Sequence, residues 1–395
     1  MNNTVKEQAE ELMREAVEQQ IVAGGSLLVI QDEQEVLYLE EGYADREEAL
    51  PISRDTIYRM YSMSKPVTAC AAMILIQQGK LDLMEPVSKY LPGFKNQMVA
   101  EEKGLVPVAR EVFIRDLLSM TSGLVYGDYP GQAGKDTCAL FEEIDERLLG
   151  ASPLGTVEAM NKLGSCALLF QPGASWAYGT SADVMGAIIE VASGIRFGEF
   201  LEKELFKPLG MMDTGFTIAP EKRNRLAYAY QTEEDGKLAK YLGNNLGIIN
   251  QMDREPAFES GGAGLMSTID DYAKFAEMLM AKGTCHGVQI LTPKSVEFLT
   301  NNHLNTVNQA AFEASGVGAY GYTYGNFMRV MTDSRKAYQL GSDGEYGWDG
   351  WLGTHFCNSP KDNMTILFMI QKKDAGLTPL AYRLRDLIYC AYGRS

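Results

Sequence analysis

The stretch Arg59-Met60-Tyr61-Ser62-Met63-Ser64-Lys65-Pro66-Val67-Thr68 runs directly into the apolar segment Ala69 to Ile76. This order predicts a helix with Pro66 in its first turn, where proline is tolerated because the first N–H groups of a helix have no internal partner. Residues three apart lie on one helical face, so Ser62 and Lys65 are expected to touch. The positive end of the helix dipole would stabilise negative charge on Ser62. The stretch therefore predicts a serine nucleophile with an amine beside it.

The pattern S-x-x-K also has a purely structural interpretation. An N-capping serine followed by an exposed lysine fits the same four residues, and roughly one chance occurrence is expected in a chain of this length. The catalytic interpretation therefore depends on whether the rest of the chain supplies the other parts of a site.

Composition excludes several functional classes. The 395 residues are 46% hydrophobic and 22% charged, which is typical of a globular protein with a large core and room for two or three domain-sized units. Lysine and arginine number 36 against 52 aspartate and glutamate residues, a net charge of −16. Nucleic acids and anionic membranes are bound by clustered basic residues, so neither is an expected partner. The acidity itself is explained by solubility.

The N-terminal segment gives an expectation about location. Met1 to Gln20 is polar, with apolar residues at helical spacing, and lacks the basic start and apolar core of a signal peptide. No apolar run approaches the length of a membrane span. The six cysteines contain no C-x-x-C pair and are interpreted as reduced thiols. These features predict a cytoplasmic protein.

Hydrophobic periodicity predicts strands at both ends of the chain and helices between them. Strands are expected at 25–31, 35–39, 56–60, 320–331, 336–340, 351–357 and 364–371, and helices at 64–78, 114–119, 182–192, 197–206, 269–280 and 377–392. This order predicts an α+β fold in which one antiparallel sheet is built from both termini and interrupted by a mostly helical insert. We expect a discontinuous sheet domain of residues 1–60 and 255–395, a helical domain of residues 61–254, and an active site at their interface.

The sequence does not support a zinc hydrolase site or the nucleophile elbow of an α/β-hydrolase. None of the three histidines has a metal-ligand spacing such as H-x-x-x-H, and no G-x-S-x-G elbow occurs. The base for Ser62 is therefore expected to be Lys65 together with a group other than histidine. Tyr178 is a candidate, because it sits on a glycine-bounded turn before a predicted helix and a nearby cation favours the ionised phenol. A buried tyrosine with a satisfied hydroxyl is the alternative.

A third stretch, Tyr346 to Phe356, alternates glycines with large aromatic residues on an expected strand edge. Glycine within a strand often marks a close approach of a ligand to the backbone. An ordinary β-bulge with core tryptophans is the alternative.

Three motifs taken in order resemble a known family. Ser62-Met63-Ser64-Lys65, Tyr178-Gly179-Thr180 and Trp348-Asp349-Gly350 resemble the serine β-lactamases and penicillin-binding proteins, most closely the class C β-lactamases and the β-lactamase-like carboxylesterases. The stretches 118–124, 206–214 and 262–272 are similar to that family as well, and the likeness extends from about residue 20 to the end. The resemblance implies the α+β fold of β-lactamases and transpeptidases.

The resemblance also implies roles for individual residues. Ser62 would form the acyl-enzyme, Lys65 would be its hydrogen-bonded amine partner, and Tyr178 would share proton transfer with Lys65. The backbone N–H groups of Ser62 and Trp351 would form the oxyanion hole. Tyr126 would be an active-site tyrosine that contacts the substrate. No metal and no organic cofactor is implied.

Departures from the family pattern concern the substrate. Thr180 stands where β-lactamases and peptidases of this group have asparagine, and Trp348 stands where they have lysine or histidine. The resemblance assigns substrate contacts to Trp348, Asp349 and Gly350, and Asp349 would add a negative charge where an anionic substrate docks. These departures favour a carboxylesterase acting on small or medium esters, with acyl transfer as a variant.

Two other functions stay open at this stage. One is a β-lactamase or D-amino-acid peptidase with the same fold, and the other is a non-catalytic sensor or binding protein on the penicillin-binding scaffold. The expected partner is a small-molecule ester or amide, with neither nucleic acid nor membrane.

Overall fold

One eight-stranded antiparallel sheet organises the molecule. The computed structural model describes residues 2–285, 287–316, 320–376 and 378–394. The strand order is β12-β13-β14-β15-β16-β1-β2-β3, so strands from both ends of the chain pair directly. These strands are β1 Gly24–Gln31, β2 Gln34–Asp45, β3 Leu50–Pro51, β12 Tyr322–Tyr324, β13 Arg329–Met331, β14 Tyr346–Asp349, β15 His355–Ser359 and β16 Met364–Ile370. The predicted α+β fold is confirmed.

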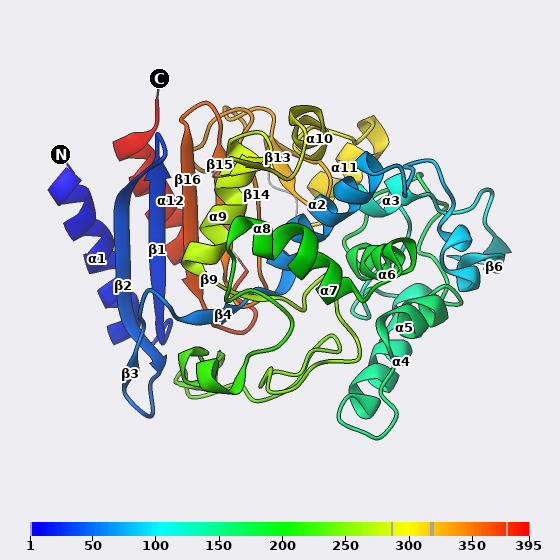
Figure 1. The fold of residues 1–395 in the computed structure, drawn as a ribbon, viewed down its shortest axis with the longest axis horizontal. Coiled ribbons are helices and arrows are strands. Elements are labelled where there is room, and N and C mark those ends of the chain that lie inside the picture. Colours follow the sequence, from blue (N-terminus) through cyan, green and yellow to red (C-terminus); the bar gives the residue numbers. More distant parts are fainter. Residues whose placement is uncertain (1, 286, 317–319, 377, 395) are drawn as a thin grey trace.

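Helices cover both faces of the sheet, which explains why its central strands β15 and β16 are buried throughout. All seven residues of β16 are buried, and successive side chains point to opposite faces. Ile366 and Phe368 pack with α1 (Asn2–Glu18) and α12 (Pro379–Tyr392), whereas Leu367 and Met369 join the core that contains α9 (Ile269–Met280). Figure 1 shows the sheet and both termini toward one end of the molecule and α3 to α6 toward the other.

The segment predicted from the S-x-x-K stretch is the central helix, α2 (Ser64–Gln77). Twelve of its 14 residues are buried, so it is enclosed on every side by the rest of the protein. The surrounding helices are α3 Ile114–Leu118, α4 Gln132–Arg147, α5 Thr156–Leu163, α6 Ser181–Ser193, α7 Phe197–Leu201, α8 Lys207–Leu209, α10 Pro293–Leu299 and α11 Thr306–Ala314. Outside the main sheet, the described residues form four two-stranded pairs, β4–β9, β5–β6, β7–β8 and β10–β11. Their strands are β4 Ile57–Arg59, β5 Met98–Glu101, β6 Gly104–Pro107, β7 Tyr230–Thr232, β8 Leu238–Lys240, β9 Met266–Thr268, β10 Thr284–Cys285 and β11 Val288–Gln289.

Several predicted elements differ from the structure. The single strand expected at 320–331 is the hairpin of β12 and β13, whose turn places Phe327 at a φ of 57°. Residues 336–340 form turns instead of a strand, and the strand expected at 351–357 begins only at His355 because residues 350–354 form a tight turn. The helix expected at 197–206 is α7 followed by a π-helical turn over 202–206. Alternation of apolar residues did not reveal these turns.

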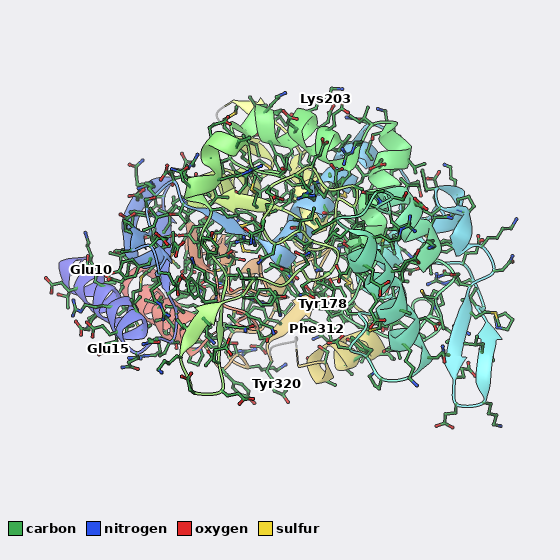
Figure 2. The ribbon with its side chains drawn as sticks, turned by 90° about the horizontal axis from the view of Figure 1, so that it is seen from below. Glu10, Glu15, Tyr178, Lys203, Phe312 and Tyr320 are labelled. Carbon is green, nitrogen blue, oxygen red and sulfur yellow. The ribbon has the colours of Figure 1, made fainter. Side chains whose placement is uncertain are left out.

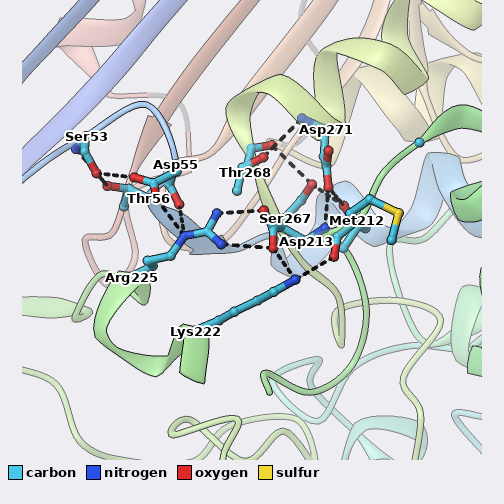
Figure 3. Close-up of polar contacts among 12 residues, drawn as sticks. Ser53, Asp55, Thr56, Met212, Asp213, Lys222, Arg225, Ser267, Thr268 and Asp271 are labelled. Atoms are coloured by element: carbon cyan, nitrogen blue, oxygen red, sulfur yellow. Dashed lines mark hydrogen bonds and ion pairs between the residues drawn. The ribbon is translucent and has the colours of Figure 1, made fainter. Parts of the chain in front are cut away.

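A charged network fixes the short β4–β9 pair that leads into the S-x-x-K stretch (Figure 3). Asp213 binds Arg225 at 2.7 Å and Lys222 at 2.6 Å, and Arg225 also reaches Asp55 at 3.0 Å. The Asp213 N–H donates to Asp271 at 2.7 Å. Asp55 lies just before β4 and Asp271 just after β9, so the network connects the loop around Asp213 to the end of this pair where Ile57 lies opposite Thr268.

No helix among the described ranges combines the length and the apolar composition needed to cross a bilayer. The division into domains at residues 60 and 255 stays a prediction.

Candidate active site

Ser62 lies on a strained turn at the entrance to α2. A 3₁₀ turn over Tyr61–Met63 separates β4 from the helix, and Tyr61 has a φ of 44°, which bulky side chains rarely adopt. The Tyr61 ring packs on Trp351 with 4.9 Å between centroids. The N-cap of α2 is Met63, and no side chain caps the helix, so Ser62 is not a capping serine. The half-buried Ser62 is free to act as a nucleophile.

Lys65 is fully buried, with a relative exposure of 0%, which rules out the exposed lysine of the alternative interpretation. Its Nζ donates to Ser62 Oγ at 3.1 Å, to Tyr126 Oη at 3.0 Å and to the Gly262 carbonyl at 2.8 Å. Within the described ranges, Lys65 forms no ion pair with a carboxylate. The amine is therefore held by uncharged oxygens beside the nucleophile.

A buried carboxylate is connected to Lys65 through Gly262. The Gly262 N–H donates to Asp183 Oδ1 at 3.0 Å, and the Ser260 hydroxyl donates to the same oxygen. Burial raises the pKa of Asp183, whereas the charge of Lys65 acts in the opposite direction. A Cβ at Gly262 would lie 2.7 Å from Asp183 Oδ2, so a larger residue would displace the Asp183 carboxylate. Our sequence analysis missed Asp183, and an acidic residue in the otherwise apolar start of α6 was the available signal.

Tyr178 stands opposite Lys65 and is held by Trp348. The indole Nε1–H of Trp348 donates to the Tyr178 hydroxyl at 3.1 Å, and Lys65 Nζ lies 4.7 Å from the centre of the Tyr178 ring. Tyr178 also stacks on Trp176, on which Phe312 packs edge to face. The positions of Tyr178 and Phe312 are labelled in Figure 2. A donor aimed at a phenol oxygen stabilises the negative charge that the oxygen carries after losing its proton.

Tyr126 lies in a different environment from Tyr178. Its ring packs edge to face on Tyr178, at 5.7 Å, and its hydroxyl receives the hydrogen bond from Lys65. Burial, with Tyr178 and Asp183 nearby, raises the pKa of Tyr126 well above its ordinary value. Tyr126 therefore stays neutral, which makes it a hydrogen-bonding group and not a base.

The turn after β14 brings Trp351 beside the nucleophile segment. The Gly350 N–H donates to the Thr354 carbonyl at 2.7 Å, and the Thr354 hydroxyl donates to the Met60 carbonyl at 3.1 Å. A Cβ at Gly350 would lie 2.3 Å from the Met60 oxygen, so glycine is required for this close approach. The side-chain N–H of Trp351 donates to Asp374, but no residue in the described part of the chain accepts a hydrogen bond from its backbone N–H. This donor is therefore available to a substrate oxygen.

The third motif does not lie on an edge strand as expected, because β14 lies between β13 and β15 inside the sheet. Strand β13 pairs with β14 at Tyr346 and Gly347 only, within the described residues, so one side of β14 is unpaired from Trp348 onward. Trp348 itself is buried, with a relative exposure of 2%.

The structure does not bring Asp349 to the site. Its carboxylate forms a two-pronged ion pair with Arg329 and a hydrogen bond with His355, on the sheet face opposite Trp348. Burial disfavours ionisation, but Arg329 and His355 hold the pKa of Asp349 well below its ordinary value. The prediction that Asp349 adds a negative charge where substrates dock is corrected, because neighbouring residues on a strand point to opposite faces.

Thr180, which stands where the family has asparagine, is also turned away. It has a relative exposure of 0%, and its hydroxyl has no hydrogen-bond partner among the described residues. A side chain this buried does not offer an amide-like contact to a substrate.

Comparison with known proteins agrees with this geometry. The family model described as Beta-lactamase matches residues 9–389. The chain belongs to the Beta-lactamase family. Protein Rv1367c of Mycobacterium tuberculosis is 31% identical to this Beta-lactamase family member over 91% of the chain and 88% of that protein. Esterase EstB of Burkholderia gladioli is 28% identical over 92% of this chain and 90% of that protein.

Among solved structures, EstCE1, described as a hydrolase with promiscuous acyltransferase activity, superimposes with a TM-score of 0.84 at 25% identity. The match covers 98% of this chain and 99% of that one. Members of the Beta-lactamase family are serine hydrolases, and this member is a hydrolytic enzyme of that fold.

Proposed function

We propose that the enzyme is a carboxylesterase that cleaves small or medium esters through an acyl-Ser62 intermediate. The observation that carries the proposal is the hydrogen bond from Trp348 to Tyr178. Related β-lactamases and peptidases use a cation at this position of the third motif to attract the substrate carboxylate. Here a buried, uncharged indole occupies the position, and its N–H is engaged by the phenol. Uncharged ester substrates fit such a site better than anionic β-lactams or peptides.

The proposed reaction uses the contacts around Lys65. The Ser62 hydroxyl gives its proton to the Lys65–Tyr178 pair while its oxygen attacks the ester carbonyl. The N–H groups of Ser62 and Trp351 stabilise the resulting oxyanion, and each such donor contributes about 3 kcal/mol in comparable enzymes. The pair then returns the proton to the departing alcohol, and the acyl group stays on Ser62. Water attacks the acyl-enzyme, with the same pair as the base, and releases the acid.

In this proposal Tyr126 orients Lys65 through the 3.0 Å hydrogen bond between them, and its ring forms one wall of the site. Gly350 serves the site by allowing β14 to approach Met60. Trp348 serves it through Tyr178. The names of two relatives support the assignment, since one is an esterase and the other a hydrolase with acyltransferase activity. Transfer of the acyl group to an alcohol is the variant that the second name favours.

The test is parallel turnover of a short p-nitrophenyl ester and a chromogenic cephalosporin by the wild-type enzyme and by Ser62→Ala. We expect ester turnover that depends on Ser62 and little cleavage of the cephalosporin. Fast cephalosporin cleavage would support the β-lactamase or peptidase alternative. Absence of turnover with every ester and lactam, in folded protein, would support the non-catalytic alternative. The cytoplasmic location predicted from the sequence stays a prediction.

A further inference from the structure

A glycine-rich segment, residues 260–265, is held between α2 and α6, and the whole segment is buried. On the side of α2, the Thr68 hydroxyl donates to the Gly261 carbonyl at 2.7 Å. On the side of α6, a Cβ at Gly261 would lie 2.3 Å from the Ala182 carbonyl oxygen, so the backbone of the segment touches this helix. The position of the segment matters to the active site because Lys65 binds one of its carbonyls.

Asp183 holds this segment from the first turn of α6. Its Oδ1 accepts from the Ser260 hydroxyl and, at 3.0 Å, from the Gly262 N–H. The carbonyl of Gly262 accepts from Lys65 Nζ at 2.8 Å. Gly262 is therefore fixed at its N–H by the carboxylate and at its carbonyl by the amine. With a relative exposure of 2%, Asp183 orients this residue without contact to a substrate.

The charge of Asp183 reaches the catalytic groups as well. Burial raises the pKa of Asp183, and the Lys65 charge together with the hydrogen bonds from Ser260 and Gly262 opposes that rise. In turn, a charged Asp183 is one reason why the pKa of Tyr126 lies well above its ordinary value. Attraction between two charges acts on both partners, so an ionised Asp183 stabilises a positive charge on Lys65.

Among the described residues, the other ionisable groups that face Lys65 are tyrosines. Tyr126 accepts a hydrogen bond from Lys65 Nζ, and the centre of the Tyr178 ring lies 4.7 Å from that atom. Tyr324 of β12 interacts electrostatically with both of these tyrosines. A tyrosine is uncharged until it loses its proton, so Asp183 supplies the standing negative charge near Lys65.

We propose that Asp183 is a positioning residue for the reaction at Ser62. It orients the Gly262 carbonyl that holds Lys65, and its charge strengthens the Lys65–Tyr178 pair as a base. When the pair takes the Ser62 proton it gains one positive charge, and a nearby carboxylate stabilises the charged form. No proton passes to Asp183, which stays ionised throughout. This inference rests on the proposed acyl-Ser62 chemistry and adds to it a residue outside the three motifs.

The test is the pH profile of ester turnover by Asp183→Asn, which keeps the size of the side chain and an acceptor for Gly262 but removes the charge. The rising limb of kcat/KM is expected to move about one unit toward lower pH, because a pair without the neighbouring charge loses its proton more readily. The value of kcat is expected to fall about three- to tenfold, since the weaker base accepts the Ser62 proton less readily. KM is expected to change little, because the buried Asp183 does not contact the substrate.

The matched control is Asp362→Asn. Asp362 has a relative exposure of 0% and also accepts from a serine hydroxyl, that of Ser359, and from a backbone N–H, that of Arg394 at 2.6 Å. It lies in the turn between β15 and β16, at the opposite end of β15 from Trp351. Loss of this charge is expected to lower the melting temperature and to leave the pH profile at its wild-type position. Melting curves accompany both variants, and Asp183→Ser, which is smaller and also uncharged, replaces Asp183→Asn if that variant does not fold.

Labelling of Ser62 by a fluorophosphonate gives a second pH profile that does not rely on an ester substrate. The labelling rate is expected to shift with pH in Asp183→Asn and to keep its wild-type profile in Asp362→Asn. If esters are not cleaved but the labelling profile shifts as expected, the proposed function fails and the role of Asp183 holds. If esters are cleaved and neither profile of Asp183→Asn shifts, the role of Asp183 is overturned and the proposed function holds.

Discussion

Buried charges are paired differently on the two faces of the sheet at β14. On the face of Trp348, the buried Lys65 is held by neutral oxygens, and the Asp183 carboxylate is connected to it through Gly262, whose carbonyl accepts from Lys65 and whose N–H donates to Asp183. On the face of Asp349, charges pair directly, as Asp349 does with Arg329 and Glu345 with Arg385 of α12. Direct pairing satisfies a buried charge and makes it chemically inert, whereas the incompletely paired face keeps a proton carrier beside a nucleophile.

The largest expected effect is a loss of turnover, from substitutions on the Trp348 face of β14, which we call the catalytic face. Ser62→Ala removes the nucleophile, and ester turnover is expected to fall at least about 1,000-fold, since covalent catalysis has no substitute group here. Lys65→Ala is expected to reduce turnover nearly as far, because the Ser62 proton then has no adjacent amine. Burst kinetics with a p-nitrophenyl ester measure both variants. Retained acyl-enzyme formation in pure Ser62→Ala protein would remove Ser62 from its assigned role.

Substitutions on the Asp349 face of β14 are expected to lower stability and to leave catalysis unchanged. Asp349→Asn leaves Arg329 buried without its counter-ion, which typically costs about 3–5 kcal/mol of unfolding free energy. Urea unfolding measures this loss, with Asp270→Asn as the control, since the exposed Asp270–Arg54 pair is worth at most about 1 kcal/mol. Turnover of the folded variant is expected to be unchanged; a large loss of turnover would show that the two faces are not independent.

The same variant gives a dependence on pH. The pKa of Asp349 is held below its value in the unfolded chain, so its stabilising contribution is fully present above about pH 4 and is lost as the pH falls through the folded-state value. The difference in unfolding free energy between the wild type and Asp349→Asn is therefore expected to shrink at acidic pH. A difference that stays constant from pH 7 to pH 3 would contradict the proposed ionised pair.

Trp348→Phe sharpens the assignment of the catalytic face. The variant keeps an aromatic ring but removes the N–H that binds Tyr178, and kcat/KM is expected to fall about tenfold, the effect of one hydrogen bond to a developing charge. Trp351→Phe is the matched control, because its side-chain N–H binds Asp374 and its backbone N–H is retained. Equal losses in the two variants would show that ring packing, and not the bond to Tyr178, matters.

The smallest expected effect is that of Tyr126→Phe. This change removes one of three hydrogen bonds to Lys65, which is worth about 1 kcal/mol or roughly fivefold in kcat/KM. The pH profile of kcat/KM is expected to keep its shape, since Tyr126 stays neutral. A loss as large as that of Ser62→Ala would instead make Tyr126 the base.

Local patterns predicted the elements that depend on neighbouring residues. The helix at 64–78 and the strands at 25–31 and 364–371 are all close to the structure. The helix expected at 269–280 is α9, and Thr268 caps it by accepting from the Asp271 N–H at 3.1 Å. The failures fall at 327, 336–340 and 350–354, where turns interrupt segments rich in apolar and aromatic residues.

The sequence by itself determined the contact between Ser62 and Lys65, because three residues on a helix leave little freedom. Only the tertiary structure decided what surrounds that pair. Gly262 lies 197 residues from Lys65 along the chain, and Trp348 lies 170 residues from Tyr178, so no local spacing encodes these hydrogen bonds. The opposite orientations of Trp348 and Asp349 likewise depend on which face of β14 meets α12, and that is set by packing of the whole sheet.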